Sequence, residues 1–187
     1  MVVEHIHLTG EEIRRRPRLD RPPLLAATRI TPVVHVEVST VKPPVGIERS
    51  RELILAAMSR ASALSTSGWV QLDMEARPSH RQFYRSLVSD VRAALPPTTR
   101  LSVTALAWWC RSGSWLNGLE ADEVVPMVFR MGKDADLLRR MWSSTPEKLH
   151  PSCRAGAIGR AMQEPLAAET LARYGRIYFF DAKHWRD

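Results

Sequence analysis

Two carboxylates share one face of a predicted strand in the segment Gln71-Leu72-Asp73-Met74-Glu75. Residues two apart on a strand are about 7 Å apart, so Asp73 and Glu75 can each shift the pKa of the other. One then serves as an acid and the other as a base. Such a pair cleaves glycosidic bonds at separations of about 5 to 9.5 Å, and we assign Glu75 as the acid and Asp73 as its assistant. The alternative is a structural ion pair between Asp73 and Arg130.

Two more polar side chains lie on a strand predicted over residues 30–38. His35 and Glu37 are two apart and share a face. An imidazole titrates near neutral pH, so His35 is a candidate acid or base; the alternative is a buried, hydrogen-bonded histidine. Gln71 shares the face of Asp73 in the same way, and we include it as a candidate substrate-binding residue.

Three tryptophans lie at and just after the end of a strand predicted over residues 101–108: Trp108, Trp109 and Trp115. Aromatic faces near a binding site stack on sugar rings through apolar contact. We expect Trp109 to pack in the core and Trp108 and Trp115 to contact a ligand.

No cofactor or metal motif accompanies these residues. The sequence has no glycine-rich phosphate loop, and Cys110 and Cys153 do not fit a metal-ligand spacing, so we expect neither a cofactor nor a metal. The two cysteines are compatible with one disulfide. We expect free thiols, because one follows a strand and the other precedes a strand, at opposite barrel ends, beyond the Cα separation of about 7 Å that a disulfide allows.

Strand-like and helix-like segments alternate along the 187 residues. Runs rich in β-branched and apolar residues predict strands over residues 2–8, 30–38, 69–75, 101–108, 124–131, 155–159 and 176–181. Apolar residues at helical spacing predict helices over residues 48–64, 79–95, 134–142 and 166–173. The polar segment 9–27, rich in Arg and Pro, is typical of a loop.

Regular alternation predicts parallel strands joined by helical crossovers, which fits both an open sheet and a barrel. The predicted strands have one apolar face, and the other face becomes polar toward the carboxyl end, where barrel active sites lie. We therefore predict one domain over residues 1–187, a (β/α)8-type TIM barrel with about seven strands. It is incomplete or short at its N-terminus, because complete barrels need about 250 residues.

The formal net charge is +7 and the pI is near 10.1. Much of the excess lies in the segment 9–27, at Arg14, Arg15, Arg16, Arg18 and Arg21. No nucleic-acid reader motif accompanies them, so we expect a solvated basic loop and no specific nucleic acid partner; such a partner would require these arginines to line one continuous face. We also expect no membrane span. The sequence as given opens without a signal-peptide pattern, which predicts a cytoplasmic protein unless the true start lies upstream.

Several motifs occur in the order found in one known family. They are WVQLDMEARPSHRQFYRSLVSDVRAALP, LSVTALAWWC, DEVVPMVFRMG and GRIYFFDAKHW, and they resemble the domain-of-unknown-function family 3142 over about residues 65–185. The resemblance implies a barrel distantly similar to glycoside hydrolases. It implies a site with Gln71, Asp73, Glu75, Arg77, Trp108, Trp109, Cys110 and Arg130. Glu164, in the segment QEP, resembles a DEP-like element after the seventh strand.

A second likeness is to the family-18 chitinases, whose fourth barrel strand ends in D-x-D-x-E. The same three positions here are Gln71, Asp73 and Glu75. In that family the Glu protonates the leaving oxygen and the Asp orients the acetamide of the substrate. The resemblance implies these roles for Glu75 and Asp73.

Together these observations predict a glycoside-hydrolase-like protein acting on a polysaccharide or glycoconjugate, with Asp73 and Glu75 as the catalytic pair. The candidate substrate-binding residues are Gln71, Trp108, Trp115, Arg130, Glu37, His35 and Glu164. The alternative is a scaffold or a carbohydrate-binding protein without catalysis, in which Trp108 and Trp115 bind the sugar. The sequence leaves the substrate, the linkage and the oligomeric state open.

Overall fold

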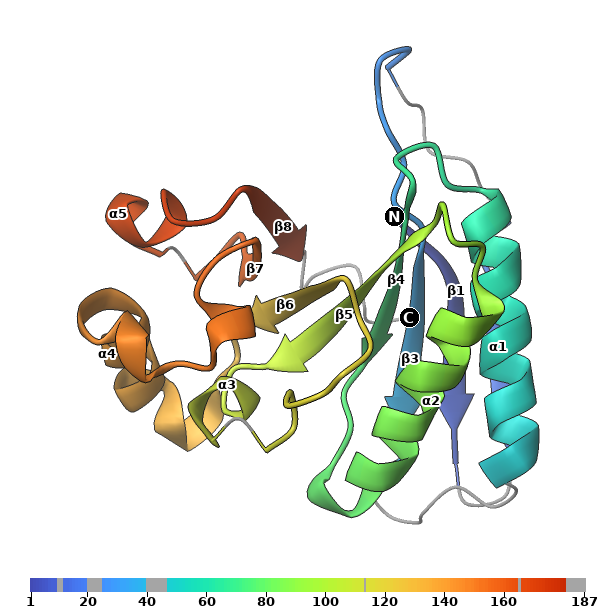
Figure 1. Ribbon diagram of the computed structural model, residues 1–187, viewed down its shortest axis with the longest axis horizontal. Helices are drawn as coiled ribbons and strands as arrows, with labels where there is room; N and C mark the ends of the chain where they lie inside the picture. The colour runs from blue at the N-terminus through green and yellow to red at the C-terminus, as the bar shows by residue number, and fades with distance from the viewer. Residues whose placement is uncertain (10–11, 20–24, 40–46, 113, 165, 181–187) are drawn as a thin grey trace. The chain divides into compact units, whose positions relative to one another are not determined.

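The computed structural model describes residues 1–9, 12–19, 25–39, 47–112, 114–164 and 166–180. The chain divides into two compact units, whose elements are shown in Figure 1. Unit 1 comprises Met1–Val103 and Glu120–Asp122, and unit 2 comprises Thr104–Leu119 and Glu123–Asp187. Each unit buries apolar side chains, such as Leu72 in unit 1 and Trp142 in unit 2.

The strands of unit 1 form a mostly parallel sheet. In chain order they are β1 (Val2–Leu8), β2 (Ile13–Pro17), β3 (Val33–Val38), β4 (Trp69–Met74) and β5 (Arg100–Leu106), which continues into unit 2. Their order in the sheet is β2-β1-β3-β4-β5. Neighbouring strands pair in parallel, except that β1 and β2 are antiparallel.

Strand β2 lies inside the segment 9–27, where the sequence predicts a loop. Its sequence, Ile-Arg-Arg-Arg-Pro, lacks the apolar alternation of a strand with one buried face. Pairing with β1 stabilises it instead, together with the ion pair between Arg15 and the buried Glu4, with 2.6 Å between Nη2 and Oε1. A strand that is stabilised mainly by its pairing partner is therefore not predicted by its own sequence.

Helices α1 (Ile47–Ala63) and α2 (Arg81–Ala94) lie on one face of this sheet, and the 3-10 turn η1 (Pro78–His80) precedes α2 (Figure 1). Arg60 of α1 donates to Glu4 Oε2 at 2.8 Å, so the sheet face that carries Glu4 is the face toward α1. The strand register places buried apolar residues on that face: Ile6, Val34, Val36, Leu72, Met74, Leu101 and Val103. Gln71 and Asp73 lie on the opposite face, as the predicted parity of β4 requires.

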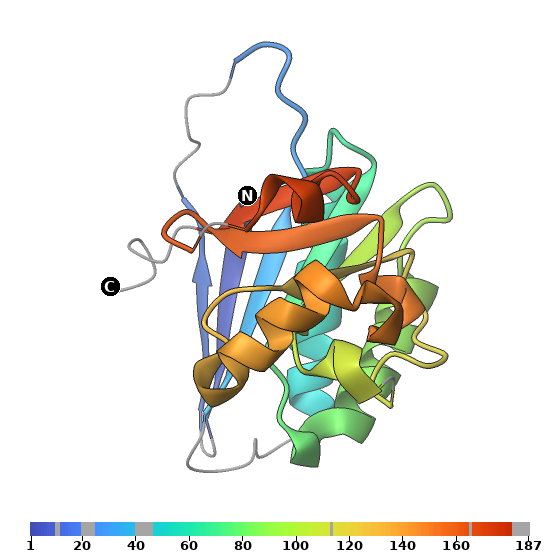
Figure 2. The same cartoon turned by 90° about the vertical axis from the view of Figure 1, so that its left-hand side faces the viewer.

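Unit 2 contains the remaining strands and shorter helices. They are α3 (Trp109–Ser112), β6 (Glu123–Met127), η2 (Gly132–Asp134), α4 (Ala135–Ser144), η3 (Pro146–Lys148), η4 (Pro151–Cys153), β7 (Ala157–Ala161), α5 (Ala168–Leu171) and β8 (Arg176–Phe180). Strands β7 and β8 lie side by side in parallel (Figure 2). Gly159 of β7 allows the ring of Phe180 to lie close, because a Cβ at this position would be 2.9 Å from Phe180 Cε2.

The strands do not close into a barrel. Among the described residues, β2 is paired only with β1 and β8 only with β7, so both are edge strands. The fold is therefore mixed α/β with eight strands, and the expected TIM barrel is not confirmed. In a barrel the outer edge of β1 would pair with the last strand, but here that edge pairs with β2.

The two cysteines of unit 2 form a disulfide, so the expectation of free thiols is wrong. Cys110 and Cys153 are bonded, with 5.9 Å between their Cα atoms. The expectation assumed that the cysteines stay near the strand ends that they follow or precede. Instead, the 3-10 turn η4 lies beside α3, and the backbone N–H of His150 donates to the carbonyl oxygen of Cys110 at 2.7 Å.

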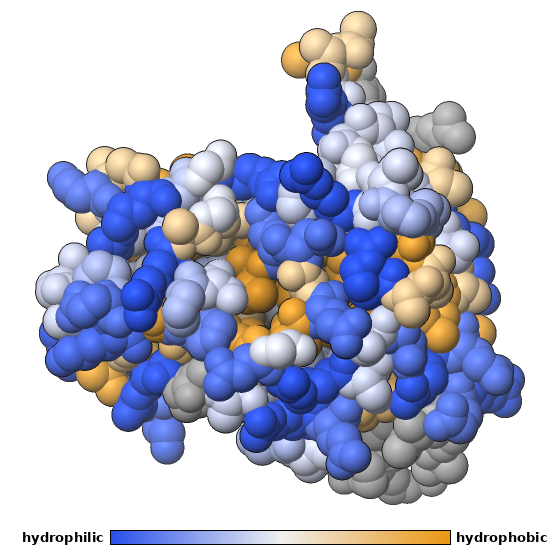
Figure 3. Space-filling model, viewed as in Figure 1, coloured by the Kyte–Doolittle hydropathy of each residue, from blue (hydrophilic) through white to orange (hydrophobic). Residues whose placement is uncertain are grey.

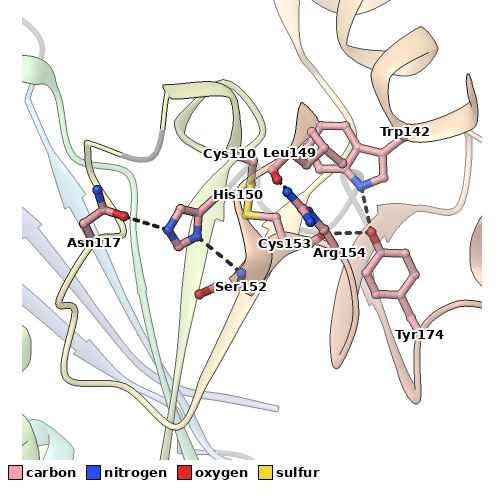
Figure 4. The surroundings of a disulfide bond; sticks show 9 residues. All are labelled: Cys110, Asn117, Trp142, Leu149, His150, Ser152, Cys153, Arg154 and Tyr174. Carbon is pink, nitrogen blue, oxygen red and sulfur yellow. Dashed lines mark hydrogen bonds between the residues drawn. A yellow bond between two sulfur atoms is a disulfide. The ribbon is translucent and has the colours of Figure 1, made fainter. Parts of the chain in front are cut away.

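A hydrogen-bonded shell surrounds the disulfide (Figure 4). Trp142 Nε1 donates to the Tyr174 hydroxyl at 3.0 Å, and that hydroxyl donates to the carbonyl oxygen of Cys153 at 2.8 Å. His150 Nδ1 accepts from the backbone N–H of Ser152, so its Nε2 donates to Asn117 Oδ1 at 2.9 Å. These polar groups fix the chain on both sides of the bond.

Hydrophilic residues predominate over the outward surfaces of the helices in the space-filling view (Figure 3). Among the described residues, no helix combines the length and the apolar composition that a membrane span needs.

Candidate functional site

A row of polar side chains crosses three strands of unit 1 on the sheet face opposite to Glu4. The parallel register aligns His5 of β1 with His35 of β3, and His35 with Asp73 of β4. The same register aligns His7 with Glu37 in the next row. Because aligned residues of paired strands lie on the same face, the sequence positions chosen on β3 and β4 meet in one cluster.

His35 and Asp73 form a buried hydrogen-bonded pair. The distance between His35 Nδ1 and Asp73 Oδ2 is 2.8 Å, and the side chains are 13% and 4% exposed. A carboxylate accepts from the imidazole, so Nδ1 carries the proton toward Asp73, and Nε2 is the nitrogen that bears the lone pair of the neutral ring. This hydrogen bond fixes the orientation of the His35 ring.

The two neighbouring histidines have pKa values shifted in opposite directions. Burial lowers the pKa of His35, but the hydrogen bond and charge of Asp73, with the charges of Glu75 and Glu37, outweigh burial and raise it overall. Burial and the nearby charge of His35 lower the pKa of His5. Adjacent groups whose pKa values are driven apart provide an acid and a base at one site.

His5, His35 and Glu37 place three potential ligand atoms within 4.8 Å of one another. His5 Nε2 lies 3.4 Å from Glu37 Oε2, and the two imidazole rings have centroids 4.8 Å apart. This His5 nitrogen is buried and makes no hydrogen bond within the described part of the chain. Metal ligands were not expected from the sequence, and His5 was not singled out, because its alignment with His35 comes from the pairing of β1 with β3.

The remaining candidates of unit 1 differ in exposure. Gln71 is buried, and its Nε2 donates to Ser102 Oγ at 3.0 Å, which gives it a structural bond between β4 and β5. Glu75 follows the end of β4 and is exposed. The buried Asp73 and the exposed Glu75 are thus in different environments, as an acid and base pair requires.

The tryptophans belong to unit 2. Trp109 and Trp115 are stacked, with ring centroids 4.2 Å apart and planes at 5°, and both are buried. The core position expected for Trp109 is confirmed. Trp115 is packed in the same way, which contradicts its expected availability to a sugar, whereas Trp108 is half-buried and packs edge-on against Trp115.

Arg130 and Glu164 also belong to unit 2, where they contact each other. Glu164 Oε1 accepts from the backbone N–H of Arg130, and Glu164 Oε2 accepts from Arg139, both at 3.1 Å. Arg130 has a left-handed backbone with φ of 48°, and the Glu164 carboxylate stabilises this turn. Asp73, which the scaffold alternative paired with Arg130, is hydrogen-bonded to His35.

The basic segment does not present its arginines on one face. Arg14 and Arg16 align with His7 and His5 on one side of β1, while Arg15 pairs with Glu4 on the other. Arg21 lies outside the described residues. Of the described arginines of β2, Arg14 and Arg16 therefore share one face, and Arg15 lies on the other.

Comparisons of the chain with family models, with curated proteins and with solved structures found no match. The resemblance to the domain-of-unknown-function family 3142 and the weaker likeness to family-18 chitinases remain predictions from the sequence motifs.

Proposed function

We propose that unit 1 carries a hydrolytic centre for a polysaccharide or glycoconjugate, built from Glu75 and the His35–Asp73 pair. The observation that carries this proposal is the hydrogen bond between the partly buried His35 and the buried Asp73, at the strand end that Glu75 follows. Asp73 is almost fully buried, so it orients His35 and does not contact the substrate. The exposed Glu75 is accessible to a polymer.

In the proposed reaction, Glu75 gives its proton to the oxygen of the leaving sugar as the glycosidic C–O bond breaks. One water molecule forms the new C–O bond and loses a proton to the cluster of His5, His35 and Glu37. That proton returns to Glu75 through solvent before the next turnover. The balance is the addition of one water molecule across one glycosidic bond.

The test is the release of new reducing ends from a panel of soluble polysaccharides. We expect Glu75→Gln to lower the rate by about 10²-fold or more, since it removes the proton donor. Glu52→Gln, at an exposed position of α1, is the matched control and should leave the rate unchanged. Equal rates for Glu75→Gln and the control, or no release from any polysaccharide, would contradict the proposal.

A second candidate function is binding without catalysis, and it is favoured by a hollow in unit 2 of about 520 Å³. Three cationic residues line it, Arg111, Arg140 and Lys148, together with the hydroxyl-bearing Ser144 and Thr145 and the apolar Leu137 and Met141. Among the described residues none of these cations forms an ion pair. Such a lining suits sulfated or carboxylated sugars, because cations and hydroxyls bind anionic groups.

Titration of a sulfated and a neutral oligosaccharide separates this candidate from a hydrolase. The candidate is supported if only the sulfated sugar binds. Arg140→Gln and added salt should weaken this binding, whereas Arg49→Gln on α1 should not. Equal binding of the neutral sugar would contradict it.

A further inference from the structure

We propose that His5, His35 and Glu37 bind one divalent transition-metal ion of the zinc type. Two imidazoles and one carboxylate are a donor set that zinc accepts, whereas magnesium and calcium prefer oxygen ligands alone. The three side chains come from β1 and β3, so two paired parallel strands position all of them.

The distances suit a shared ion after small side-chain rotations. Two ligand atoms of a tetrahedral zinc, each about 2.0 to 2.2 Å from the metal, are about 3.4 Å apart. His5 Nε2 and Glu37 Oε2 are already 3.4 Å apart, and all three ligand atoms are within 4.8 Å. Glu37 is 54% exposed, so its side chain is free to rotate toward the ion.

The position of the His5 Nε2 atom is the feature of the cluster that a purely structural role explains least. This atom is buried and makes no hydrogen bond within the described residues, and the Glu37 carboxylate lies 3.4 Å from it, a distance at which an ion bound by both groups would fit. A metal ion would satisfy this nitrogen.

Asp73 hydrogen-bonds to one of the proposed ligand histidines, as carboxylates commonly do at metal sites. It accepts from His35 Nδ1 at 2.8 Å, which fixes the ring and leaves Nε2 as the nitrogen that would bind the ion. Asp73 is therefore a positioning residue for the metal and not a ligand.

Three protein ligands leave the fourth position of a tetrahedral ion for water, which the metal makes acidic enough to ionise near pH 7. The inference concerns the same cluster as the proposed hydrolysis, and in mechanism it rests on that proposal. With the ion bound, the ligand atoms of the cluster are occupied, so the bound water would lose its proton to solvent instead. Metal binding itself is measured without any substrate, so either proposal can fail alone.

The experiment is calorimetric titration of the purified, chelator-treated chain with Zn²⁺ and, separately, with Mg²⁺. We expect one Zn²⁺ per chain and no measurable Mg²⁺ binding. Saturating Zn²⁺ should also raise the melting temperature, because it binds only the folded state. Addition of Co²⁺ should give the visible absorption of a four-coordinate ion.

The variants should lower the Zn²⁺ affinity by different amounts. His5→Gln and Glu37→Gln remove ligands and should lower the Zn²⁺ affinity by more than 100-fold, while Asp73→Asn should lower it by about 10- to 100-fold. His150→Gln in unit 2 removes an imidazole elsewhere and should bind as the unchanged chain does. If His35→Gln does not fold, His5→Gln and Glu37→Gln still decide the outcome.

Binding of no Zn²⁺ by the folded, unchanged chain would overturn the inference. So would equal Zn²⁺ affinity in His5→Gln and His150→Gln, because the ion would then bind elsewhere.

Discussion

At the residue scale, the chemistry of unit 1 depends on how Asp73 is used. The sequence places Asp73 and Glu75 on one strand face as a catalytic pair, with Glu75 as the acid and Asp73 as its assistant. The structure instead buries Asp73 against His35 and leaves Glu75 exposed. One carboxylate therefore stabilises an imidazole, and the other remains accessible to a ligand.

Removing the Asp73 carboxylate should destabilise unit 1. Asp73→Ala leaves His35 without its buried partner, and breaking such a pair costs about 3 to 5 kcal/mol. Asp73→Asn keeps an acceptor for Nδ1–H and should cost about 1 to 3 kcal/mol. Urea unfolding measures both, with Glu75→Gln as the control, for which we expect a change below about 0.5 kcal/mol. A larger cost for Glu75→Gln than for Asp73→Ala would reverse the assignment.

The His35–Asp73 pair should also make stability depend on pH. The pKa of His35 is raised in the folded chain, so its stabilising contribution is complete below the unfolded value of about 6.5 and is lost as pH rises through the folded pKa. The difference in unfolding free energy between the unchanged chain and His35→Gln should therefore shrink from pH 6 toward alkaline pH, in the presence of a chelator. A difference that grows with pH would show that the pKa of His35 is lowered.

At the scale of elements, the sequence patterns predict best where a segment is stabilised by its own apolar residues. The predicted helix over residues 48–64 matches α1, and the strand over residues 69–75 matches β4 to within one residue. Within α1 the buried residues Ile54, Met58 and Ala61 recur at helical spacing, so one face of the helix packs in the core.

What the sequence could not predict depends on partners distant along the chain. Strand β2 exists because β1 pairs with it, and the alignment of His5 with His35 depends on the register of two strands. The disulfide depends on where η4 lies relative to α3. These features arise from tertiary contacts, which the local spacing of residues does not encode.

The contact between β7 and β8 gives a prediction at this scale. In Gly159→Ala the new methyl group would meet the ring of Phe180 at 2.9 Å, so the strands must separate or the ring must move, at a cost of about 1 to 3 kcal/mol. Thermal unfolding measures this cost. When Phe180 is already Ala, the further change Gly159→Ala should lower the free energy of unfolding much less than it does in the unchanged chain. Additive effects of the two substitutions would show that the ring is not the obstacle.

At the scale of the whole molecule, each unit has its own means of stabilisation. Unit 1 packs α1 and α2 on a parallel sheet, and unit 2 adds a covalent bond to a smaller set of elements. The closed loop between Cys110 and Cys153 spans a sequence separation of 43. A disulfide over a loop of this length restricts the unfolded chain and persists mainly in oxidising compartments.

Removing the disulfide should destabilise unit 2 selectively. Loop-closure entropy predicts a loss of about 4 kcal/mol for the double variant Cys110→Ala with Cys153→Ala. Hydrogen exchange should show faster exchange of amides in unit 2, with those of β3 and β4 little changed. A reductant should destabilise the unchanged chain but not the double variant. An unchanged chain that is insensitive to the reductant would mean that the bond does not form.

Hydrolysis of a polysaccharide in water enriched in ¹⁸O, followed by mass spectrometry of the products, tests directly whether unit 1 carries a hydrolytic centre. We expect one ¹⁸O atom at each new reducing end, because water supplies the oxygen of the bond that forms. The amount of ¹⁸O-labelled product should fall by about 10²-fold or more in Glu75→Gln and strongly in His35→Gln, while Glu52→Gln should leave it unchanged. Products without ¹⁸O, or incorporation that persists in both Glu75→Gln and His35→Gln, would contradict the assignment of a hydrolytic centre to this face of unit 1.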